Sequence, residues 1–461
     1  MGLTDEERRA MEAAGRRAVA FRAGLHRAPA IPALRPDAIA GRFQGDLPDH
    51  GSPADAVLTR MVDDAEPGVH AHASGRFFGY VCGGSMPVGV AADFMVSAWG
   101  QNSASSWESP SVAAMEQCVC HWCLDLLDLP RDAGVGIVSG ATVANTQAIM
   151  AARHALLAAQ GWDVEDKGLF GAPEFPVLIG EDAHSAPLAG LRYAGLGAGR
   201  ATRIATDAEG RIKVDALLAS LEDCAAPPLV ILQAGQINTG AFDPFAEIIP
   251  AVHAKGGWVH VDGAFGLWLR AVPALRDRLE GVEAADSWAV DLHKWLSAPY
   301  DAGLCIVRRR DTLVEAMTAR GAYLPDQSDT WEPSDSTLEL SRRARGVPSY
   351  AILRHLGRAG VRALVQGHCD LARHVASRLT ASPGIEVLNS VVSNQVAVSC
   401  GSDDLTKATL ARVQANGRVY PSHGTWQGRQ IIRISISNYA TTRDDVDLLC
   451  DEIIAARRAV A

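Results

Sequence analysis

Short apolar runs alternate with helical stretches from about residue 76 to 310, and this alternation restricts the fold more than any other feature. The runs are VGIVS, FPVLIG, PLVILQAG, WVHVDGA, DSWAV and GLCIVRR, and helical periodicity lies between them over 142–159, 186–194, 213–224 and 244–255. Strands that are apolar throughout are buried on both faces, and strands that alternate with helices form a mostly parallel sheet covered by helices. The sequence therefore predicts an α/β fold.

The length of the chain and the order of its patterns predict three parts. Its 461 residues are enough for more than one domain. We expect a helical N-terminal segment over 1–75, a large domain with the mostly parallel sheet over 76–345, and a smaller C-terminal α+β domain over 346–461. The last part is predicted from helical runs at 346–360 and 362–382, a strand near 395–400, a helix at 403–416, the strand IIRISIS and a helix at 442–458.

Composition and charge argue against several classes of protein. The chain is 48% apolar and 21% charged, which is ordinary for a globular protein. Its formal net charge is −10 with acidic and basic residues well mixed, which argues against a nucleic-acid partner. No run of about eighteen apolar residues predicts a membrane span, and the N-terminus lacks the apolar core of a signal peptide. We therefore expect a cytoplasmic protein.

Nine cysteines, mostly within apolar segments, are typical of reduced thiols in a cytosolic core. One group resembles a metal site, because Cys118, Cys120 and Cys123 surround His121 in MEQCVCHWCLDLLDLP. That segment has helical periodicity, however, and side chains at these spacings do not share one face of a helix. We therefore expect core cysteines and no metal ligands here.

Lys294 stands at the end of an apolar run, in SWAVDLHKWLSAPYDAG, where a buried strand is predicted. A lysine normally stays in water, and burying it costs free energy unless it is paired, neutral or covalently modified. Alone, the pattern also fits a lysine whose stem lies along the strand while its amine reaches solvent. The ends of the other strands decide between these interpretations.

Three other strand ends carry groups that suit one ligand. After VGIVS, Gly140 opens a turn into a helix that Thr142 can cap, and a helix start is a ready anion site. Asp262 closes the run WVHVD, where it could instead cap the next helix. His184 follows the strand over 176–180, where its flat ring could cap, pack or stack on an aromatic cofactor.

An anion cradle, a stacking ring, a carboxylate and a lysine together are what pyridoxal phosphate requires. The lysine forms a Schiff base with the aldehyde, the helix start takes the phosphate, and the acid holds the pyridinium, which makes the ring an electron sink. A charge pair at contact distance contributes about 4 kcal/mol at an effective dielectric constant of about 20, which keeps a pyridine protonated. The sequence therefore predicts a pyridoxal 5′-phosphate site, where Lys294 is buried because it is held as an imine.

The same stretches resemble those of the group II pyridoxal-phosphate decarboxylases, which include the aromatic-L-amino-acid and glutamate decarboxylases. The resemblance extends from RFFGY (76–80) to RISISNYATTRDDVD (433–447) and is most specific in ADSWAVDLHKW. That match implies that Lys294 is the catalytic Schiff-base lysine, that His293 contacts the phosphate and that Asp291 belongs to the cofactor site. It also implies a fold type I enzyme and a homodimer with active sites at its interface, with 1–75 wrapping the partner subunit.

Further matches carry other site residues of the family onto this chain. HVDGAFG resembles the stretch that places an acid, here Asp262, at the pyridine nitrogen and a small residue, here Ala264, against the ring. AHSA resembles the stretch with the stacking histidine, His184, which the family implies as a second catalytic residue. The resemblance also implies Gly140, Ala141 and Thr142 of the phosphate loop SGAT. For the substrate pocket it implies Tyr80 in FFGYV, and Gln236 and Asn238 in GQINTGAFDPF, near the strand and turn that run below the cofactor.

Arg433 in IIRISIS resembles the arginine that binds a substrate carboxylate in other fold type I enzymes, which would suit an aminotransferase. Fixing that carboxylate would oppose its loss, so the alternative is a strand arginine on the solvent face of the small domain. Aromatic residues near the expected pocket could line an apolar side-chain site or belong to the core. They are Phe77, Phe78, Tyr80, Trp99 and Trp107.

The resemblance implies decarboxylation of an L-amino acid, or of an amino-acid-derived conjugate, through a Schiff base and a quinonoid. In aromatic-amino-acid decarboxylases a mobile-loop tyrosine returns a proton to Cα, but the matching stretch SDTWEPSDSTL has no tyrosine, and Tyr323 lies upstream. Family members that lack this tyrosine can divert the reaction to oxidative deamination, which gives an aldehyde, and β-elimination is a further alternative. A cofactor-free paralogue that only binds a partner is the non-enzyme alternative, and the intact lysine, acid, histidine and phosphate loop argue against it.

Overall fold

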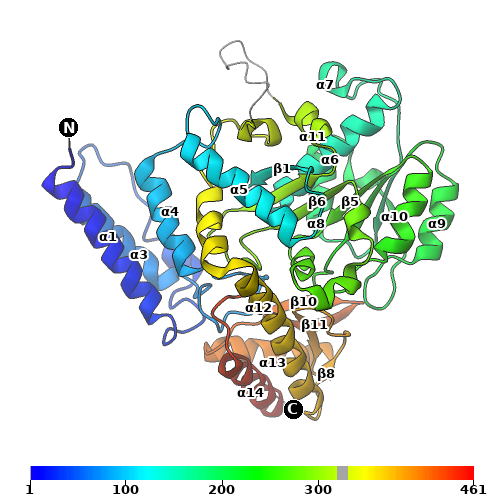
Figure 1. The fold of residues 1–461 in the computed structure, drawn as a ribbon. Coiled ribbons are helices and arrows are strands. Elements are labelled where there is room, and N and C mark those ends of the chain that lie inside the picture. Colours follow the sequence, from blue (N-terminus) through cyan, green and yellow to red (C-terminus); the bar gives the residue numbers. More distant parts are fainter. Residues whose placement is uncertain (1, 319–330, 461) are drawn as a thin grey trace.

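The computed structural model describes residues 2–318 and 331–460, so Tyr323 and the first residues of SDTWEPSDSTL lie outside the described residues. The larger of two sheets has seven strands and lies at the centre of the molecule (Figure 1). In spatial order the strands are β1 (Gly134–Val138), β7 (Gly303–Val307), β6 (Ser287–Asp291), β5 (Trp258–Asp262), β4 (Leu229–Gln233), β2 (Val177–Gly180) and β3 (Thr202–Ile204).

The direction of these strands brings six carboxyl ends to one edge of the sheet. β7 runs antiparallel to β1 and β6, and the remaining neighbours are parallel. Because β7 lies between β1 and β6, these two strands share one direction with β5, β4, β2 and β3. The sequence prediction of an α/β fold with a mostly parallel sheet is confirmed.

Both faces of the large sheet are buried, which explains why its strands are apolar throughout. Along β4, Val230 and Leu232 pack into one cluster, and Leu229 and Ile231 pack into another on the opposite face. The helices that contribute to the first cluster include α5 (Pro110–Leu126), α9 (Val214–Glu222) and α10 (Phe245–Ala254). The helices of the second are α6 (Ala141–Ala158), α8 (Ser185–Tyr193) and α11 (Arg310–Met317).

A smaller antiparallel sheet forms the centre of the C-terminal part. Its strand order is β10 (Ser422–Trp426), β11 (Arg429–Ser435), β9 (Gln395–Ser399) and β8 (Glu386–Val387). The helices packed around it are α12 (Gly346–Thr380), α13 (Asp403–Asn416) and α14 (Arg443–Ala459). This confirms an α+β arrangement after the large sheet, whereas the exact domain boundaries at 75 and 345 stay a prediction.

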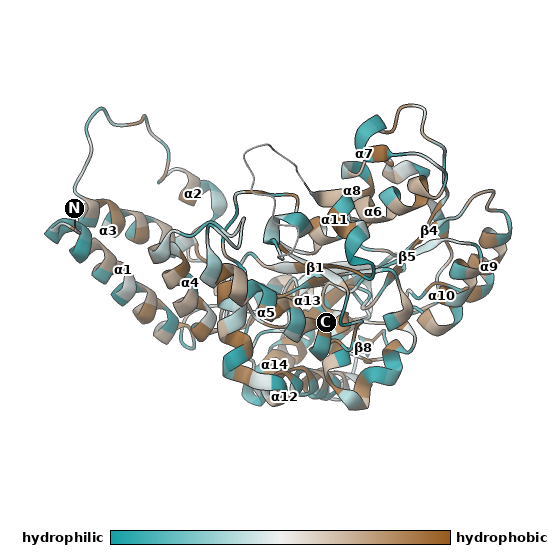
Figure 2. Cartoon of the chain, turned by 45° about the horizontal axis from the view of Figure 1, so that its top comes forward, coloured by the Kyte–Doolittle hydropathy of each residue, from teal (hydrophilic) through white to brown (hydrophobic). Residues whose placement is uncertain are grey.

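The N-terminal helices stand to one side of the body, as Figure 2 shows. They are α1 (Asp5–Gly24), α2 (Pro36–Ala40) and α3 (Ala54–Ala65), and none of the three contains a buried residue. A capping box between Thr4 and Glu7 begins α1. At the other end of α1, Arg22 donates hydrogen bonds to the carbonyls of Gly84 and Ser85, which ties the helix to the body just before α4 (Pro87–Trp99).

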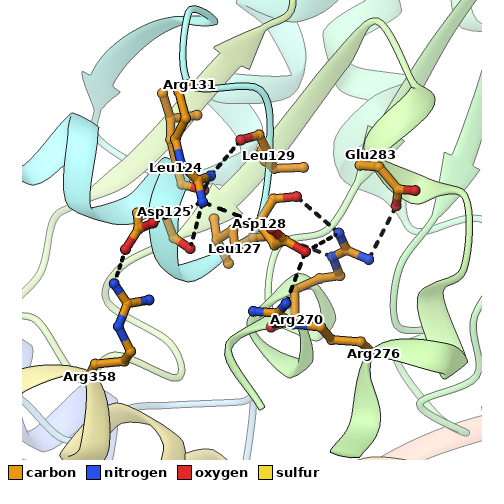
Figure 3. A network of polar contacts seen from close by, with 10 residues as sticks. All are labelled: Leu124, Asp125, Leu127, Asp128, Leu129, Arg131, Arg270, Arg276, Glu283 and Arg358. Carbon is orange, nitrogen blue, oxygen red and sulfur yellow. Dashed lines mark hydrogen bonds and ion pairs between the residues drawn. The ribbon is translucent and has the colours of Figure 1, made fainter. Parts of the chain in front are cut away.

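A polar network joins the end of α5 to α12 and to two 3₁₀ helices, η3 (Gly266–Ala271) and η4 (Pro273–Leu279) (Figure 3). Asp128 accepts hydrogen bonds from Arg270 at 3.1 Å and from Arg276 at 3.0 Å. Asp125 forms ion pairs with Arg131 and Arg358, and Arg358 follows the residue at which α12 is interrupted. The network therefore joins α12, just after its break, to the large domain.

Several elements differ from the sequence prediction. The two helical runs after residue 346 form one interrupted element, α12, whose break lies at Gly357 with φ of 59°. β3, β8 and β10 were not predicted because they are short or half-exposed and lack an apolar run. The remaining short helices are α7 (Val164–Lys167), η1 (Glu66–Gly68), η2 (Ala198–Arg200), η5 (Val282–Ala284) and η6 (Pro333–Ser336).

The cysteine cluster of α5 packs as expected in part. Cys120 and Cys123 are buried in the core, and Cys118 is partly exposed. Within residues 2–318 and 331–460, no group of three or more His, Cys, Asp or Glu side chains is arranged to hold a metal ion. Over the same residues, no helix has both the length and the apolar character needed to cross a membrane.

Candidate active site

A cavity of about 410 Å³ lies at the edge of the large sheet where the carboxyl ends of β1, β2, β4, β5 and β6 meet. Such an edge is where open α/β sheets bind their ligands. Nine of its lining residues are those that the sequence assigned to a cofactor site: Gly140, Ala141, Thr142, His184, Asp262, Ala264, Asp291, His293 and Lys294. The structure therefore brings together residues that lie up to about 150 positions apart in the chain.

Lys294 is the lysine that faces this cavity. The chain has five lysines, and the other four, at 167, 213, 255 and 407, are exposed. The Lys294 side chain is 19% exposed, and its Nζ lies 3.0 Å from Asp291 Oδ2. A carboxylate at this distance offsets the loss of hydration, so the amine is held in the cavity rather than extended into solvent.

Asp291, at the end of β6, also holds the start of α6. Its Oδ1 accepts a hydrogen bond from Ala141 N at 2.6 Å. Gly140 is the N-cap residue of α6, and a Cβ there would lie 2.9 Å from His293 Cε1, so this approach requires glycine. The prediction that Thr142 caps the helix is wrong, because Thr142 lies in the first turn and Asp291 supplies the acceptor from another strand.

The start of α6 remains suited to an anion. In the first turn of a helix, the backbone N–H groups have no intrahelical acceptor and the helix dipole favours negative charge. Ala141 N is used by Asp291, whereas the N–H groups of Thr142 and Val143 belong to the same turn at the cavity wall. This arrangement fits a phosphate group.

His293 is fixed as a neutral ring beside this helix start. Its Nδ1 accepts a hydrogen bond from Ala302 N at 3.2 Å, so the ring proton lies on Nε2, which is 3.5 Å from Asp291 Oδ1. Burial lowers the pKa of His293, and the Asp291 charge only partly opposes this. The face of its ring lies 4.5 Å from the ring of Tyr300, measured between centroids.

Asp262 closes β5 on the floor of the cavity. The residue is buried, and its Oδ1 accepts a hydrogen bond from Ala264 N at 3.2 Å. Burial raises the pKa of the Asp262 carboxyl, although the charges of His184 and Lys294 act in the opposite direction. A buried acid in this condition is stabilised in its ionised form by a cation brought to contact, such as a protonated ring nitrogen.

His184 both caps a helix and faces the cavity, which are two of the interpretations that the sequence left open. It is the N-cap residue of α8, and its Nδ1 accepts a hydrogen bond from Ala186 N at 3.1 Å. The ring also lines the cavity, where loss of hydration lowers the pKa of the imidazole. A neutral His184 therefore carries its proton on Nε2 and presents an uncharged ring to the cavity.

The four residues predicted for the substrate pocket do not line this cavity. Gln236 accepts hydrogen bonds from the backbone of Asn238 and Thr239 and donates one to the Asp182 carbonyl, so its amide is used within the protein. Asn238 is buried and donates to the Thr425 carbonyl. Both side chains are therefore committed to holding the turn after β4.

Tyr80 and Arg433 lie outside the lining residues as well. The hydroxyl of Tyr80 lies 3.5 Å from that of Tyr420, and half of Tyr80 is exposed. Arg433, on β11, is partly buried, and its Nε has no hydrogen-bond partner among the described residues. Burial lowers the pKa of Arg433. Of the other aromatic residues, Phe77 and Phe78 belong to the core, and Trp99 and Trp107 are exposed.

Sequence reasoning missed several lining residues, among them Gln233, Ile237 and Phe265. Gln233 is the last residue of β4, and its Oε1 accepts a hydrogen bond from His184 N at 3.2 Å. A signal for it was present, because Gln233 ends an apolar run in the same way as Asp262 and Asp291 do.

Comparison with known proteins identifies the family. Residues 36–400 match the family described as the pyridoxal-dependent decarboxylase conserved domain, and this range is well over half of the chain. The chain belongs to the pyridoxal-dependent decarboxylase family. It is therefore a carboxy-lyase-type enzyme that uses pyridoxal 5′-phosphate, as the sequence predicts.

Curated relatives of this decarboxylase are similar over most of their length. Tryptophan decarboxylase 1 of Oryza sativa subsp. japonica is 24% identical over 446 residues, which cover 89% of this chain and 85% of the relative. Phenylacetaldehyde synthase of Arabidopsis thaliana is 24% identical over 432 residues, covering 88% and 87%. Aromatic-L-amino-acid decarboxylase of Rattus norvegicus is 25% identical over 451 residues, covering 93% of each chain.

Solved structures confirm the fold of the decarboxylase. The structure of Oryza sativa TDC with PLP and tryptamine superposes with a TM-score of 0.92 at 21% identity and covers 99% of this chain and 98% of its own. Rhodiola rosea 4-hydroxyphenylacetaldehyde synthase superposes with a TM-score of 0.86 at 20% identity, covering 97% of each chain.

The cavity of this decarboxylase fits its cofactor by the chemistry of its walls. A helix start without intrahelical acceptors suits the phosphate, a buried acid suits the ring nitrogen, and a paired lysine suits the aldehyde. When bound, the cofactor takes up the electron pair that the departing CO2 leaves behind.

Proposed function

We propose that this enzyme removes the α-carboxylate of an L-amino acid as CO2, and that Lys294 is the residue that holds the cofactor. The observation that carries this proposal is that the one partly buried lysine of the chain shares a cavity with the buried acid Asp262. A lysine and an acid on opposite sides of a cavity can hold a pyridine ring between them. The start of α6 then supplies the third point of attachment.

In this proposal, different residues of the cavity bind different parts of the cofactor. The backbone N–H of Thr142, in the turn that Gly140 and Ala141 begin, would hold the phosphate, while Ala141 N stays bonded to Asp291. His293 lies on the same side with its proton on Nε2. Asp262 stays ionised against the ring nitrogen. When the cofactor is bound, His184 and Ala264, which both line the cavity, would cover the two faces of its ring.

Asp291 controls the proton of Lys294 in this proposal. Its Oδ2 lies 3.0 Å from Nζ, close enough to accept the ammonium proton. When the cofactor is bound, Asp291 would hold the proton that Lys294 gives up and would return it when a substrate amine takes the place of the lysine. His293 and Ala141 hold the Asp291 carboxylate in place for both steps.

We take an aromatic L-amino acid as the substrate class. Relatives over nearly the whole chain are named for tryptophan, tyrosine or aromatic L-amino acids, and this supports the choice. The apolar lining residues Ile237 and Phe265 also suit a flat apolar side chain.

A second reaction is favoured by one observation in the sequence. The stretch SDTWEPSDSTL contains no tyrosine at the place where aromatic-amino-acid decarboxylases have one. Relatives named phenylacetaldehyde synthase and 4-hydroxyphenylacetaldehyde synthase match this chain as well as the decarboxylases do. Decarboxylation coupled to oxidative deamination, with oxygen consumed and an aldehyde formed, is therefore the alternative outcome.

The assembly and location that we propose are a homodimer in the cytoplasm. Helices α1 and α3 have no buried residue, yet they expose Met11, Val19, Val57 and Met61. Apolar side chains in this number on two helices support their burial against a second copy. The cysteines of the chain are free, which supports a reducing compartment.

Product analysis tests the proposed function. The holoenzyme is incubated with a panel of L-amino acids, products are identified by mass spectrometry and dissolved oxygen is recorded. An amine with CO2 and no oxygen uptake establishes simple decarboxylation, and an aldehyde with oxygen consumed establishes the alternative. The Lys294→Ala variant is the control and should form neither product, whereas full turnover in that variant would contradict the assignment of Lys294.

A further inference from the structure

Gln233 has a position that no part of the proposed chemistry uses. It is the last residue of β4, and in the parallel β4–β5 pair it is in register with Asp262. Register partners in parallel strands project their side chains to the same face, so Gln233 stands beside the acid on the cavity floor. The residue is 4% exposed and lines the cavity.

The orientation of the Gln233 amide is fixed by one hydrogen bond. Oε1 accepts from His184 N at 3.2 Å, and because a backbone N–H can only donate, the oxygen must occupy this end. The Nε2 amide group points the other way and donates to no atom of the described residues. Because Gln233 lines the cavity, this amide group can give its hydrogen bonds to a ligand there.

Two other buried glutamines differ from Gln233, because their Nε2 groups donate hydrogen bonds within the protein. Gln236 Nε2 donates to the Asp182 carbonyl, and Gln147 Nε2 donates to the Ser336 carbonyl at 3.1 Å. Both Nε2 donors are used within the protein, and neither residue lines the cavity. Gln233 therefore differs from them in presenting its donor to a ligand.

The order of the strands indicates which part of the cofactor meets this donor. In pyridoxal phosphate the ring nitrogen and the aldehyde-bearing carbon lie opposite each other, so Asp262 and Lys294 define one axis of the ring. The phosphate-bearing edge faces the start of α6, which follows β1 on the far side of β6 and β7. The remaining edge faces β4, and it carries a methyl group and the 3-oxygen, of which only the oxygen accepts hydrogen bonds.

We propose that Gln233 Nε2 donates a hydrogen bond to the 3-oxygen of pyridoxal phosphate, while its carbonyl anchors the His184 backbone. This inference rests on the proposed function, because it takes Lys294 and Asp262 as the ends of the ring. Gln233 is then a cofactor-binding residue that stabilises the 3-oxygen in its anionic form. It also links the position of the ring edge to the position of the stacking histidine.

Two substitutions of Gln233 separate this role from a purely structural one. Gln233→Leu removes the donor and the anchor, and Gln233→Glu keeps an acceptor for His184 N but replaces the donor with a negative charge. We measure the dissociation constant of pyridoxal phosphate by titration of each apoenzyme, and the pH midpoint of the absorption change of the bound cofactor. Gln147→Leu, which removes a buried amide away from the cavity, is the matched control.

The proposal predicts that Gln233→Leu weakens cofactor binding about tenfold, the loss of one hydrogen bond of about 1.4 kcal/mol. Gln233→Glu should weaken it more and shift the pH midpoint upward, because a carboxylate opposes an anionic 3-oxygen. Gln147→Leu should bind as the wild type does. If Gln233→Glu binds like the wild type while Gln233→Leu does not, only the anchor to His184 matters and the proposal is overturned.

Unchanged binding and an unchanged midpoint in both Gln233 variants would also overturn the proposal. Thermal unfolding of each apoenzyme is recorded alongside, and Gln233→Glu is the informative variant if Gln233→Leu fails to fold. A wild-type protein that bound no pyridoxal phosphate would instead overturn the proposed function, so the two failures are distinguishable.

Discussion

The Asp291 side chain serves two groups at once, since one oxygen pairs with Lys294 and the other holds the N-terminus of α6. Because the Asp291 carboxylate accepts a hydrogen bond at the N-terminus of α6 and pairs with the Lys294 amine, it must stay in place when the cofactor binds. Lys294 therefore depends on a residue that a local reading of the sequence would treat only as part of a strand. This dependence can be tested with a substitution that removes the charge of the Asp291 side chain and keeps its shape.

Asp291→Asn should slow the loading of cofactor onto the apoenzyme by at least about tenfold, because an amide can still accept from Ala141 N but cannot take the proton of Lys294. The measurement is the growth of cofactor absorbance after mixing. Asp286→Asn is the control, since Asp286 binds Val259 N at the beginning of β6, away from the cavity. Loading of Asp291→Asn at the wild-type rate would show that the carboxylate has no such role.

Asp262→Asn should lower kcat by about a hundredfold or more while the cofactor stays bound. A charge pair at contact contributes about 4 kcal/mol at an effective dielectric constant of about 20, and its loss leaves the ring nitrogen unprotonated. Single-turnover CO2 release, measured at a cofactor content checked by absorbance, gives the value. A decrease of less than tenfold in the loaded variant would argue against an ion pair with the ring.

The residues of the site that could be predicted from the sequence share one property. Lys294, Asp262 and His184 are polar groups directly after apolar runs, and parallel strands bring such positions to one edge. Thr142 was misread as a cap because the true acceptor, Asp291, comes from about 150 residues away. Gln233 escaped attention because a neutral amide has fewer specific uses than a charge.

At the scale of elements, a network of ion pairs around the buried Arg270 and the partly exposed Asp125 and Asp128 joins α5, η3 and α12. Asp128 has φ of 52°, and its carboxylate joins Arg270 and Arg276 (Figure 3). The Arg270 side chain is 7% exposed, so its charge relies on Asp128 and on Glu283. Removing one partner of such a set leaves a buried charge partly uncompensated.

Asp128→Ala should reduce the free energy of unfolding by about 1–3 kcal/mol through the loss of charged hydrogen bonds to Arg270 and Arg276. Urea unfolding of the holoenzyme measures the change. Asp132→Ala is the control, because Asp132 is exposed and forms no ion pair within the described ranges. Equal stability of the two variants would mean that the network does not join these elements.

Some strands have a strong local pattern of apolar residues in the sequence, and others do not. The six apolar runs became β1, β2, β4, β5, β6 and β7 to within two residues, because burial on both faces leaves no room for another pattern. β8 and β10 are short or alternate in exposure, and they form only because β9 and β11 offer them edges. Their existence follows from the tertiary fold, which a local reading cannot supply.

At the scale of the whole molecule, two buried histidines link stability to pH. His260 bonds to Ser287 and Asn145, and burial lowers its pKa to about 3. His368 accepts from Trp295 Nε1 and contacts the Asn438 carbonyl, and burial lowers its pKa to about 4. Both rings are neutral in the fold, whereas in the unfolded chain each takes up a proton near pH 6.5.

Because the unfolded chain binds more protons than the folded one between pH 4 and 6.5, stability falls as the pH decreases through this range. Each histidine contributes up to about 1.4 kcal/mol per pH unit. Urea unfolding at pH 7, 6 and 5 should show this decline, and His368→Gln should show a shallower one. A free energy of unfolding that stays constant from pH 7 to 5 would contradict the neutral state of both rings.

The attachment of the cofactor to Lys294 can be measured directly. The purified holoenzyme is reduced with borohydride, digested and mapped by mass spectrometry, and with only five lysines in the chain the assignment is unambiguous. We expect the phosphopyridoxyl group on Lys294 and on none of the other four, and we expect no label in Lys294→Ala. A label on another lysine, or a wild-type protein that cannot be labelled at all, would contradict the site described above.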